Sequence, residues 1–380
     1  MAKKAYIGVD NVARKIKKGY VGVDGVARKI KKAYIGIGGV ARPCWSGGEL
    51  AYYGTATALS TARHSLAATT VGDYALFGGG VESSYGTNTV NAYNKSLTRS
   101  TPTALSASRY NLAATTVGNY ALFAGGDYSG HTARTEVDAY NTSLTRSTPT
   151  ALSKGQYQHA ATTVGDYALF AGSYQDAIVH AYNKSLTRSM PTTLTYGRNS
   201  MGATTVGNYA LFGGGVIGGQ VDGTYVRADV DAYNTSLTRS TPTALSEARY
   251  ALTATTVGDY ALFGGGGDRG TYMSFVTVVD AYNTSLTRSK PTALSVGRGY
   301  FKATTVGEYA LFGGGRTGKT YSPNKSNVVD AYNASLTRST PTALNTARDT
   351  LAATTVGDYA LFGGGNTGSV SAIVDAYTVA

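Results

Sequence analysis

The sequence predicts an all-β chain folded as a seven-bladed propeller, and two observations predict it. Seven near-copies of one unit of 42 to 51 residues fill the chain from about residue 50 to its end, and a repeat of this length is typical of solenoids and propellers. Their Thr-Thr-Val-Gly segments begin at Thr69, Thr115, Thr162, Thr204, Thr255, Thr304 and Thr354. Each unit also holds short apolar stretches between regularly spaced turn residues, which indicates strands rather than helices.

Each unit predicts four strands. In the first unit these are expected at residues 66–71, 74–80, 90–93 and 98–106. Gly72-Asp73 lies between the first two strands and suits a type II′ hairpin turn. Pro102 lies in the fourth strand and has no N–H to donate, so we expect this strand at the outer edge of the sheet.

The two ends of the repeat region predict a closed ring rather than an open solenoid. The seventh unit stops after its third strand, at residues 374–377. Residues 55–63, ahead of the first unit, repeat the sequence of the outer strand. We therefore expect an N-terminal strand at about residues 50–62 to complete the last blade and remove two exposed sheet edges. A solenoid would instead need polar caps at both ends.

The unit resembles the kelch repeat. The family has an Arg before the first strand, a small-residue strand, an aromatic strand that ends in paired glycines, and a later Tyr. In the second unit these are Arg109, Ala113-Ala114, residues 120–126 and Tyr140. The Trp that the family carries after this Tyr is absent, and a leucine such as Leu144 stands at about its place. The resemblance implies a propeller but no particular activity, because propellers host unrelated functions.

Residues 1–48 form a separate module with a repeat of 14 residues, and residues 49–380 form the propeller. Each repeat predicts a hairpin, with its turn at Asp10-Asn11, Asp24-Gly25 or Gly38-Gly39. Three small hairpins cannot bury a core of their own. We therefore expect this module to pack on the propeller, on other copies of the chain or on a larger assembly, with an oligomeric arrangement in that assembly.

The positive charge of the chain is concentrated in this module. It holds eleven Lys and Arg against two Asp, whereas residues 49–380 are close to neutral. Two interpretations stay open: docking on an acidic partner surface, or solvation of hairpin faces and blunting of their edges. Nucleic acid is not favoured, because no nucleic-acid-binding motif accompanies the charge. The predicted docking residues are Arg14, Lys15, Lys17, Lys18, Arg28, Lys29, Lys31 and Lys32.

Hairpins of this kind followed by kelch-like units resemble tail-associated structural proteins of Firmicutes phages and prophages. The residues that carry the resemblance are 33–42, Ala-Tyr-Ile-Gly-Ile-Gly-Gly-Val-Ala-Arg, which lead towards the blades. The resemblance implies a virion or tail-like particle as context and, as partners, other structural proteins of that particle. No apolar segment of a secretory signal follows Met1, so we expect synthesis in the bacterial cytoplasm and a final location in the virion.

Sequence variation is confined to one face of the predicted ring. The turn between the first and second strands is Gly-Asp, Gly-Asn or Gly-Glu in every unit, and the turn before the outer strand is nearly constant. By contrast, the segment between the second and third strands differs in length and residues, as does the segment just past the repeated Arg. In a propeller these two variable segments share one face. Loops drift wherever they are tolerated, but drift does not explain why half of the loops stayed constant. An alternative explanation for the constant turns is a folding constraint, because Gly turn geometry and the Asn side chain can both be structural.

The variable segments are rich in aromatic residues separated by Ser, Gly, Asn and Arg, which is the chemistry of antibody-like binding surfaces. We predict a ligand-binding face made by Tyr85, Tyr110, Asn111, Tyr128, Tyr157, Gln158, Tyr174, Asn199, Tyr225, Tyr250, Tyr272, Phe275, Tyr300, Phe301, Tyr321 and Asp349.

Several motifs that suggest other chemistry are better explained by structure. The Gly-Gly-Gly segments lack the helix and the Gly-Lys-Ser/Thr of a phosphate loop, and we interpret them as close approaches of strand ends. The Asn-x-Ser segments are expected to be turns. The four histidines (His64, His131, His159 and His180) lack metal-ligand spacing, and the single cysteine, Cys44, lies outside the propeller. We expect no cofactor and no metal.

An enzyme is the main competing class. A copper oxidase of the kelch family would need a cysteine inside the propeller. A glycan hydrolase would need paired acids near the central pocket, and only Glu247 and Asp349 lie in the segments nearest to it. The repeated arginines, such as Arg109, are expected to make structural bonds between blades. We therefore expect a non-enzymatic protein of a phage or tail-like particle that binds a host-surface glycan or protein. The alternative is a structural decoration or adaptor without a host ligand.

Overall fold

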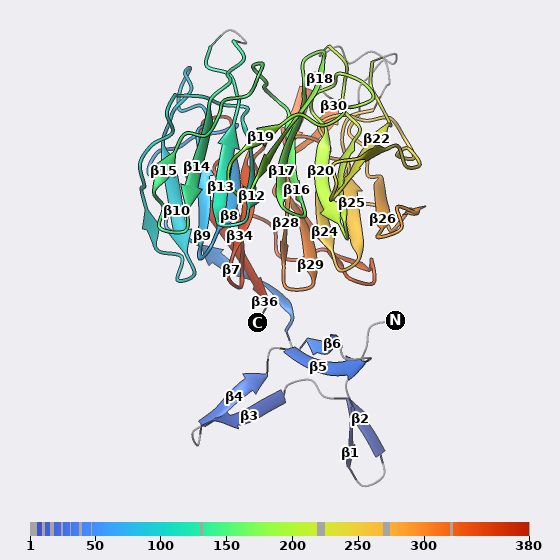
Figure 1. The fold of residues 1–380 in the computed structure, drawn as a ribbon. Coiled ribbons are helices and arrows are strands. Elements are labelled where there is room, and N and C mark those ends of the chain that lie inside the picture. Colours follow the sequence, from blue (N-terminus) through green and yellow to red (C-terminus); the bar gives the residue numbers. More distant parts are fainter. Residues whose placement is uncertain are drawn as a thin grey trace.

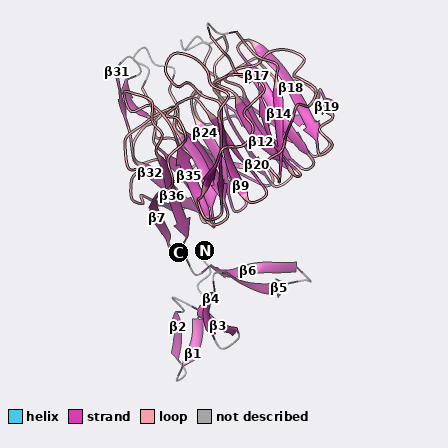
Figure 2. Cartoon of the chain, turned by 90° about the vertical axis from the view of Figure 1, so that its left-hand side faces the viewer, coloured by secondary structure: helices cyan, strands magenta, loops and turns pink. Residues whose placement is uncertain are grey.

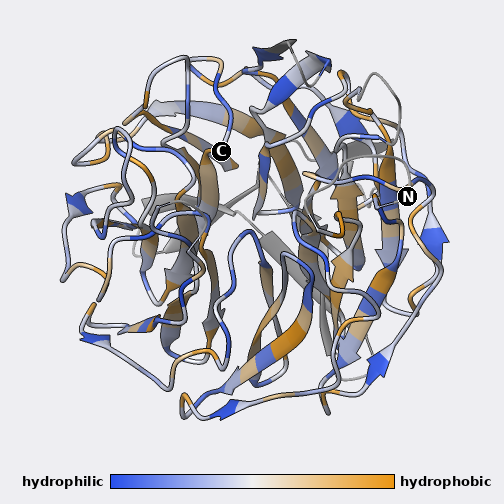
Figure 3. Cartoon of the chain, turned by 90° about the horizontal axis from the view of Figure 1, so that it is seen from above, coloured by the Kyte–Doolittle hydropathy of each residue, from blue (hydrophilic) through white to orange (hydrophobic). Residues whose placement is uncertain are grey.

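The structure is a computed structural model, which describes residues 48–129, 132–218, 225–268, 274–319 and 322–379, together with six strands within residues 6–46. Seven antiparallel sheets of four strands follow one another along the chain. They surround a common axis, as the view down the ring shows (Figure 3). Across the described residues, no helix has the length and apolar character needed to cross a membrane.

We number the blades 1 to 7 in chain order, from the sheet that contains β8 to the sheet that contains β34, and each has the same strand order from the centre outwards. The innermost strands are β8 (Ala67–Val71), β12 (Ala113–Val117), β16 (Ala160–Val164), β20 (Gly202–Val206), β24 (Thr253–Val257), β28 (Lys302–Val306) and β34 (Ala352–Val356). The second strands are β9 (Tyr74–Gly78), β13 (Tyr120–Ala124), β17 (Tyr167–Ser173), β21 (Tyr209–Gly213), β25 (Tyr260–Gly264), β29 (Tyr309–Gly313) and β35 (Tyr359–Gly363). The third strands are β10 (Val90–Asn94), β14 (Val137–Asn141), β18 (Asp176–Asn183), β22 (Val230–Asn234), β26 (Val279–Asn283), β32 (Val329–Asn333) and β36 (Val374–Val379).

The outer strands are shorter than the sequence predicts. They are β11 (Arg99–Ser100), β15 (Arg146–Ser147), β19 (Arg188–Ser189), β23 (Arg239–Ser240), β27 (Arg288–Ser289), β33 (Arg338–Ser339) and, in the last blade, β7 (Leu50–Thr55). The prediction of an outer strand over 98–106 was therefore too long. The pairing stops ahead of Pro102, which has no N–H for the ladder, and the following residues cross to the next blade.

The predicted closure of the ring is confirmed. β7 pairs with β36 from Leu50 opposite Val379 to Thr55 opposite Asp375, so the N-terminal strand completes the seventh blade (Figure 1). The hydroxyl of Tyr52 also donates a hydrogen bond to Asp375 Oδ1 over 2.6 Å. The strand covers only the first part of the expected 50–62, because the residues after Thr55 match the crossing segment of the other blades.

A ring of threonine hydrogen bonds joins the seven innermost strands. The first Thr of each Thr-Thr pair bonds the second Thr of a neighbouring blade with Oγ1–Oγ1 distances of 2.8 to 3.0 Å, and Thr354 with Thr70 closes the circle. Small residues precede these threonines because seven strands converge on the axis. The constant Thr-Thr is therefore part of the scaffold.

Aromatic side chains pack between blades. Phe77 meets Tyr93 edge to face with ring centroids 5.8 Å apart, and the other blades repeat this pair. The Tyr93 hydroxyl donates to the backbone oxygen of Thr57, in the segment that precedes its blade. A Cβ on Gly78 would lie 2.8 Å from the ring of Phe123 in the next blade. This glycine is therefore needed for the close approach of strand ends.

The repeated arginines are fully buried and make structural bonds. Arg249, just before β24, contacts Asp280 of β26 with Nη2 to Oδ2 at 2.6 Å, and four other blades carry the same ion pair. Blade 1 pairs Arg63 with Asn91, and blade 3 replaces both members with Gln156 and His180. Asp280 also accepts a hydrogen bond from the backbone of Ser246 in the previous blade's crossing segment, so the pair ties adjacent blades together.

Two further groups of strands lie outside the blades. β30 (Arg316–Lys319) and β31 (Ser322–Lys325) form a hairpin in the loop of blade 6. In the N-terminal region, β1 (Tyr6–Val9) pairs with β2 (Val12–Lys15), β3 (Gly19–Val23) with β4 (Val26–Ile30), and β5 (Lys32–Ile37) with β6 (Val40–Ser46). The three N-terminal pairs are antiparallel, as predicted, and the two residues between the strands of each pair lie outside the described residues (Figure 2).

Candidate binding site at the variable face

The two faces of the ring differ in their loops. The constant turns lie together at one face, which we call the constant face, and the loops between second and third strands rise from the other, the variable face (Figure 1). At the constant face, the Asn94 side chain accepts hydrogen bonds from the backbone N–H groups of Ser96 and Thr98, both at 3.0 Å. Asn-x-Ser is therefore a turn in this protein, as predicted.

The chain enters the propeller on the constant face. β7 runs antiparallel to β36, and its first residue, Leu50, pairs with Val379 at the end of the chain. The third strands, including β36, run from the variable face to the constant face. Leu50 therefore lies at the constant face, and the N-terminal region joins the ring opposite the variable loops.

Seven residues form a continuous backbone ring around the channel on the variable face. Each stands two positions after the repeated Arg or its Gln156 equivalent and has a φ of 50 to 55°: Ser65, Asn111, Gln158, Ser200, Ala251, Tyr300 and Thr350. Each N–H donates to the carbonyl oxygen of its counterpart in the preceding blade over 2.8 to 3.0 Å, and Ser65 to Thr350 closes the circle. We call these residues the mouth ring. Their backbone is the same in every blade, while their side chains differ.

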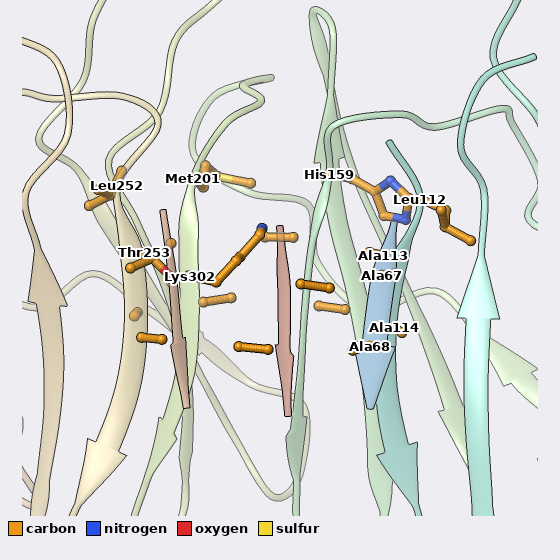
Figure 4. Close-up of a pocket in the computed structure, with 18 of the residues that line it drawn as sticks. Ala67, Ala68, Leu112, Ala113, Ala114, His159, Met201, Leu252, Thr253 and Lys302 are labelled. Atoms are coloured by element: carbon orange, nitrogen blue, oxygen red, sulfur yellow. The ribbon is translucent and has the colours of Figure 1, made fainter. Parts of the chain in front are cut away.

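The mouth ring surrounds a cavity of about 420 Å³, which falls within the usual size of small-molecule sites. His64, Tyr110, Phe301 and Arg316 also line it. A narrower channel of about 210 Å³ continues below, lined mainly by the alanines of the innermost strands (Figure 4). Leu112, His159 and Lys302 are among the residues that border both spaces.

The structure divides the predicted binding residues into three groups. Tyr110, Asn111, Gln158 and Tyr300 line the mouth cavity. A second group projects from the loops: Tyr85, Tyr128, Tyr174 and Tyr225 have exposed fractions of 38 to 63 %. Tyr157 is half-buried beside the mouth, and burial together with the charge of Asp127 raises its pKa.

The third group is buried, although its member Phe301 also lines the mouth cavity: Asn199, Tyr250, Phe275, Phe301 and Asp349. Phe301 occupies the position of Leu112 in another blade and packs on Phe312. Tyr250 packs with Val226 and meets Tyr300 edge to face, at a centroid distance of 6.4 Å. These five side chains have at most 8 % of their surface exposed, and their contact with a ligand stays a prediction.

Two of the predicted residues, Tyr272 and Tyr321, lie outside the described residues. So do Lys17, Lys18 and Lys31 of the predicted docking set. The remaining five, Arg14, Lys15, Arg28, Lys29 and Lys32, stand on the described hairpin strands, and only their backbone pairing is described.

Sequence reasoning missed a set of arginines that stack on the tyrosines of this face. The Arg227 guanidinium lies 4.0 Å from the ring centre of Tyr196, and that of Arg316 lies 4.7 Å from Tyr300. Arg134 stacks on Tyr128 in the same way at 5.3 Å. The available signal was the presence of Arg in the variable segments. Arginine held over an aromatic ring keeps its donors in place for a polar ligand.

Three charged groups beside the mouth form a cluster. Arg316 Nε lies 2.7 Å from Asp349 Oδ2, and Lys325 lies 3.9 Å from the same oxygen. Burial lowers the pKa of His64, although the charge of Asp349 opposes this shift. Burial and a hydrogen bond to Asp127 raise the pKa of Tyr110 to about 12, so its hydroxyl stays protonated and can donate at neutral pH.

The residues that line the mouth supply hydroxyl, amide, imidazole and cationic groups but no carboxylate, within the described part of the chain. Nor do three or more His, Cys, Asp or Glu of the described ranges gather as metal ligands would. The arrangement is therefore suited to holding a polar ligand by hydrogen bonds and aromatic stacking.

Comparison with solved structures identifies the architecture. The fold is similar to that of YjhT, with a TM-score of 0.57 and 13 % sequence identity over 76 % of this chain and 99 % of YjhT. This chain is a seven-bladed β-propeller. No protein-family model matches the propeller sequence, and no curated protein matches it either. At this level of identity the likeness to YjhT concerns the fold alone.

Proposed function

We propose that this chain is a non-enzymatic structural protein of a phage or tail-like particle, which binds a host-surface receptor such as a glycan through its variable face. The kelch-like repeats and the resemblance of residues 33–42 to tail-associated proteins supply the context. In this proposal the basic hairpins dock the chain to other proteins of the particle.

The observation that carries the proposal is the placement of the exposed tyrosines relative to the chain entry. Tyr85, Tyr128, Tyr174 and Tyr225 stand on four different loops of the variable face. Leu50, where the N-terminal region joins, lies on the opposite face. A chain anchored through its hairpins would thus present the tyrosines away from the anchor. Exposed aromatic rings with polar neighbours suit both glycans and proteins.

The mouth favours binding over hydrolysis. Glycoside hydrolysis commonly uses two carboxyl groups that flank the bond to be broken. Asp349, the acid nearest to the mouth in the sequence, is buried and paired with Arg316. In that state it is an acceptor that positions Arg316, and it is not presented to a substrate.

The test is binding of labelled full-length protein to intact cells of candidate Firmicutes hosts and to a glycan array. A variant with Tyr85, Tyr128, Tyr174 and Tyr225 changed to Ser is expected to lose binding by at least about tenfold, because stacked aromatic anchors dominate such interfaces. Its fold should be intact by circular dichroism, because all four side chains are exposed.

The matched control carries Tyr53→Ser and Met190→Ser. These residues are also large, apolar and exposed, but they stand on or beside outer strands. The control should bind like the wild-type protein. If wild-type protein binds no host cell and no glycan while it still assembles onto particles, the receptor role is wrong and a structural decoration is left.

A further inference from the structure

One blade breaks the pattern of small residues at the top of the channel. The first residue of the innermost strand is Ala, Gly or Thr in six blades, at positions 67, 113, 160, 202, 253 and 352. In β28 it is Lys302. Figure 4 shows its side chain extending between the innermost strands, among the alanines. A long cation therefore occupies a space that the other blades leave to methyl groups.

Lys302 has no ionic or hydrogen-bonding partner among the described residues. Each buried repeat arginine, by contrast, has an acceptor such as Asp280 or Asn91. Asp349, an acid beside the mouth, is held by Arg316. The Lys302 side chain is exposed to the channel space, and desolvation by the surrounding blades lowers the pKa of its amine. A cation in such surroundings is stabilised by an anion that enters beside it.

A second polar side chain breaks the apolar layer just above. The residue before the innermost strand is Leu, Met or Phe in six blades, and His159 in blade 3. The His159 side chain is 93 % buried and lines both the mouth and the channel. Its ring lies near the backbone of Ala124, but neither ring nitrogen has a well-formed hydrogen bond among the described residues. Burial lowers its pKa to about 3, so the ring is neutral and offers one N–H donor. Figure 4 shows it at the same end of the channel as Lys302.

The surroundings of the two groups select the class of ligand. One amine compensates one negative charge. Most other side chains of the channel are Ala, Leu or Met, although most of the exposed channel surface is polar. A phosphate or sulfate dianion would bring two charges to a single amine, and a charge held away from water must be paired and hydrogen-bonded. A carboxylate needs one charge and few donors. The wider mouth above can hold the rest of a molecule, between Tyr110 and Tyr300.

We propose that the channel mouth is a binding site for a small organic carboxylate, with its charge on Lys302, a hydrogen bond from His159 and its body in the mouth ring. This inference goes beyond the proposed host-surface role and does not depend on it. The exposed loop tyrosines are not needed for it.

The chain offers matched variants for the test. Lys302→Ala and His159→Leu each install the residue that other blades carry at the same position, so both should fold. Lys290→Ala removes an exposed lysine that does not border either cavity and serves as the charge control. The probes are D-glucuronate, its neutral counterpart D-glucose, and inorganic phosphate, titrated calorimetrically into full-length protein.

Glucuronate is expected to bind saturably, and glucose and phosphate at least about tenfold more weakly. Lys302→Ala should weaken glucuronate by about tenfold to a hundredfold, as expected for a lost charge-assisted hydrogen bond. His159→Leu should weaken it severalfold, and Lys290→Ala should leave it unchanged.

The proposal is overturned if no saturable binding of glucuronate is found up to the solubility of the sugar acid. It is equally overturned if Lys302→Ala binds as well as wild type, or if phosphate binds better than glucuronate. The four-tyrosine variant should retain glucuronate binding, so failure of the receptor role and failure of this site are separate results.

Discussion

The buried Arg–Asp pairs allow a quantitative test, because one blade supplies a neutral replacement. In blade 5, Arg249 and Asp280 are both fully buried. Arg249 Nη2 donates to Asp280 Oδ2 and Nη1 donates to the backbone of Val278 at 3.1 Å. In blade 3, Gln156 contacts His180 at 3.2 Å and donates to Ile178, the equivalent of Val278. The neutral pair thus meets the same backbone partner.

The perturbation is Asp280→His, alone and together with Arg249→Gln. The single change leaves the Arg249 guanidinium buried without its counter-charge, which typically costs about 3–5 kcal/mol. The double change rebuilds the blade 3 arrangement, and the loss should fall to about 1 kcal/mol, because buried ion pairs can be replaced by neutral groups at little cost. The entropy of unfolding of roughly 330 residues is about 0.7 kcal/mol/K, so the single variant should melt about 4–7 °C lower than wild type.

The assay is thermal and urea-induced unfolding of wild type, both single variants and the double variant, as a double-mutant cycle. A coupling free energy of about 2 kcal/mol or more is expected for groups in direct contact. The reasoning is refuted if the double variant melts no higher than Asp280→His, because the two positions would then not act as one pair.

Two further predictions concern the ring and the channel. Thr70→Val removes the hydroxyl that bonds Thr354 at the junction between the last and first blades. This variant should lower the free energy of unfolding, measured by urea titration, by about 1–2 kcal/mol. An unchanged urea midpoint would show that the threonine ring does not stabilise closure. The pKa of His159 is lowered to about 3 in the folded protein against about 6.5 in the unfolded chain. The unfolded state therefore takes up this proton first, and wild type should lose stability relative to His159→Leu as the pH falls from about 6.5 towards 3. Melting curves at pH 7 and pH 4.5 check this, and an equal difference between the two proteins at both pH values would contradict it.

The architecture was predictable because the same repeat unit occurs seven times in the sequence. The Thr-Thr-Val-Gly segments mark the innermost strands, and the missing outer strand of the last unit indicates closure by the N-terminus. The length of the outer strand was not predictable with the same certainty, because the segment around Pro102 has strand-like composition. Only the pairing shows that its ladder ends at Ser100.

The site was predictable as a face but not as a set of contacts. Tyr85 and Tyr110 were assigned to the same surface from topology alone, and both are there. Phe301 and Tyr250 were assigned to it because they are aromatic and variable, yet they fill core positions. Whether an aromatic side chain in a loop turns inwards depends on loops from elsewhere in the chain, such as Val226 against Tyr250. Lys302 was missed because a single departure inside a strand is visible only once the strand is known to face the channel.

The mouth ring explains how one face can vary while the ring stays closed. Its seven residues share a positive φ, and the backbone hydrogen bonds between them involve no side chain, so exchanging a side chain leaves these bonds intact. Ser200→Asn should therefore be neutral or slightly stabilising, because Asn tolerates this conformation well. Gly125 also has a positive φ, of 60°, but a Cβ there would lie 2.4 Å from the carbonyl oxygen of Gln156. Gly125→Ala should therefore lower the melting temperature clearly. If Ser200→Asn lowers the melting temperature as much as Gly125→Ala does, then backbone conformation, and not space, limits variation at the mouth.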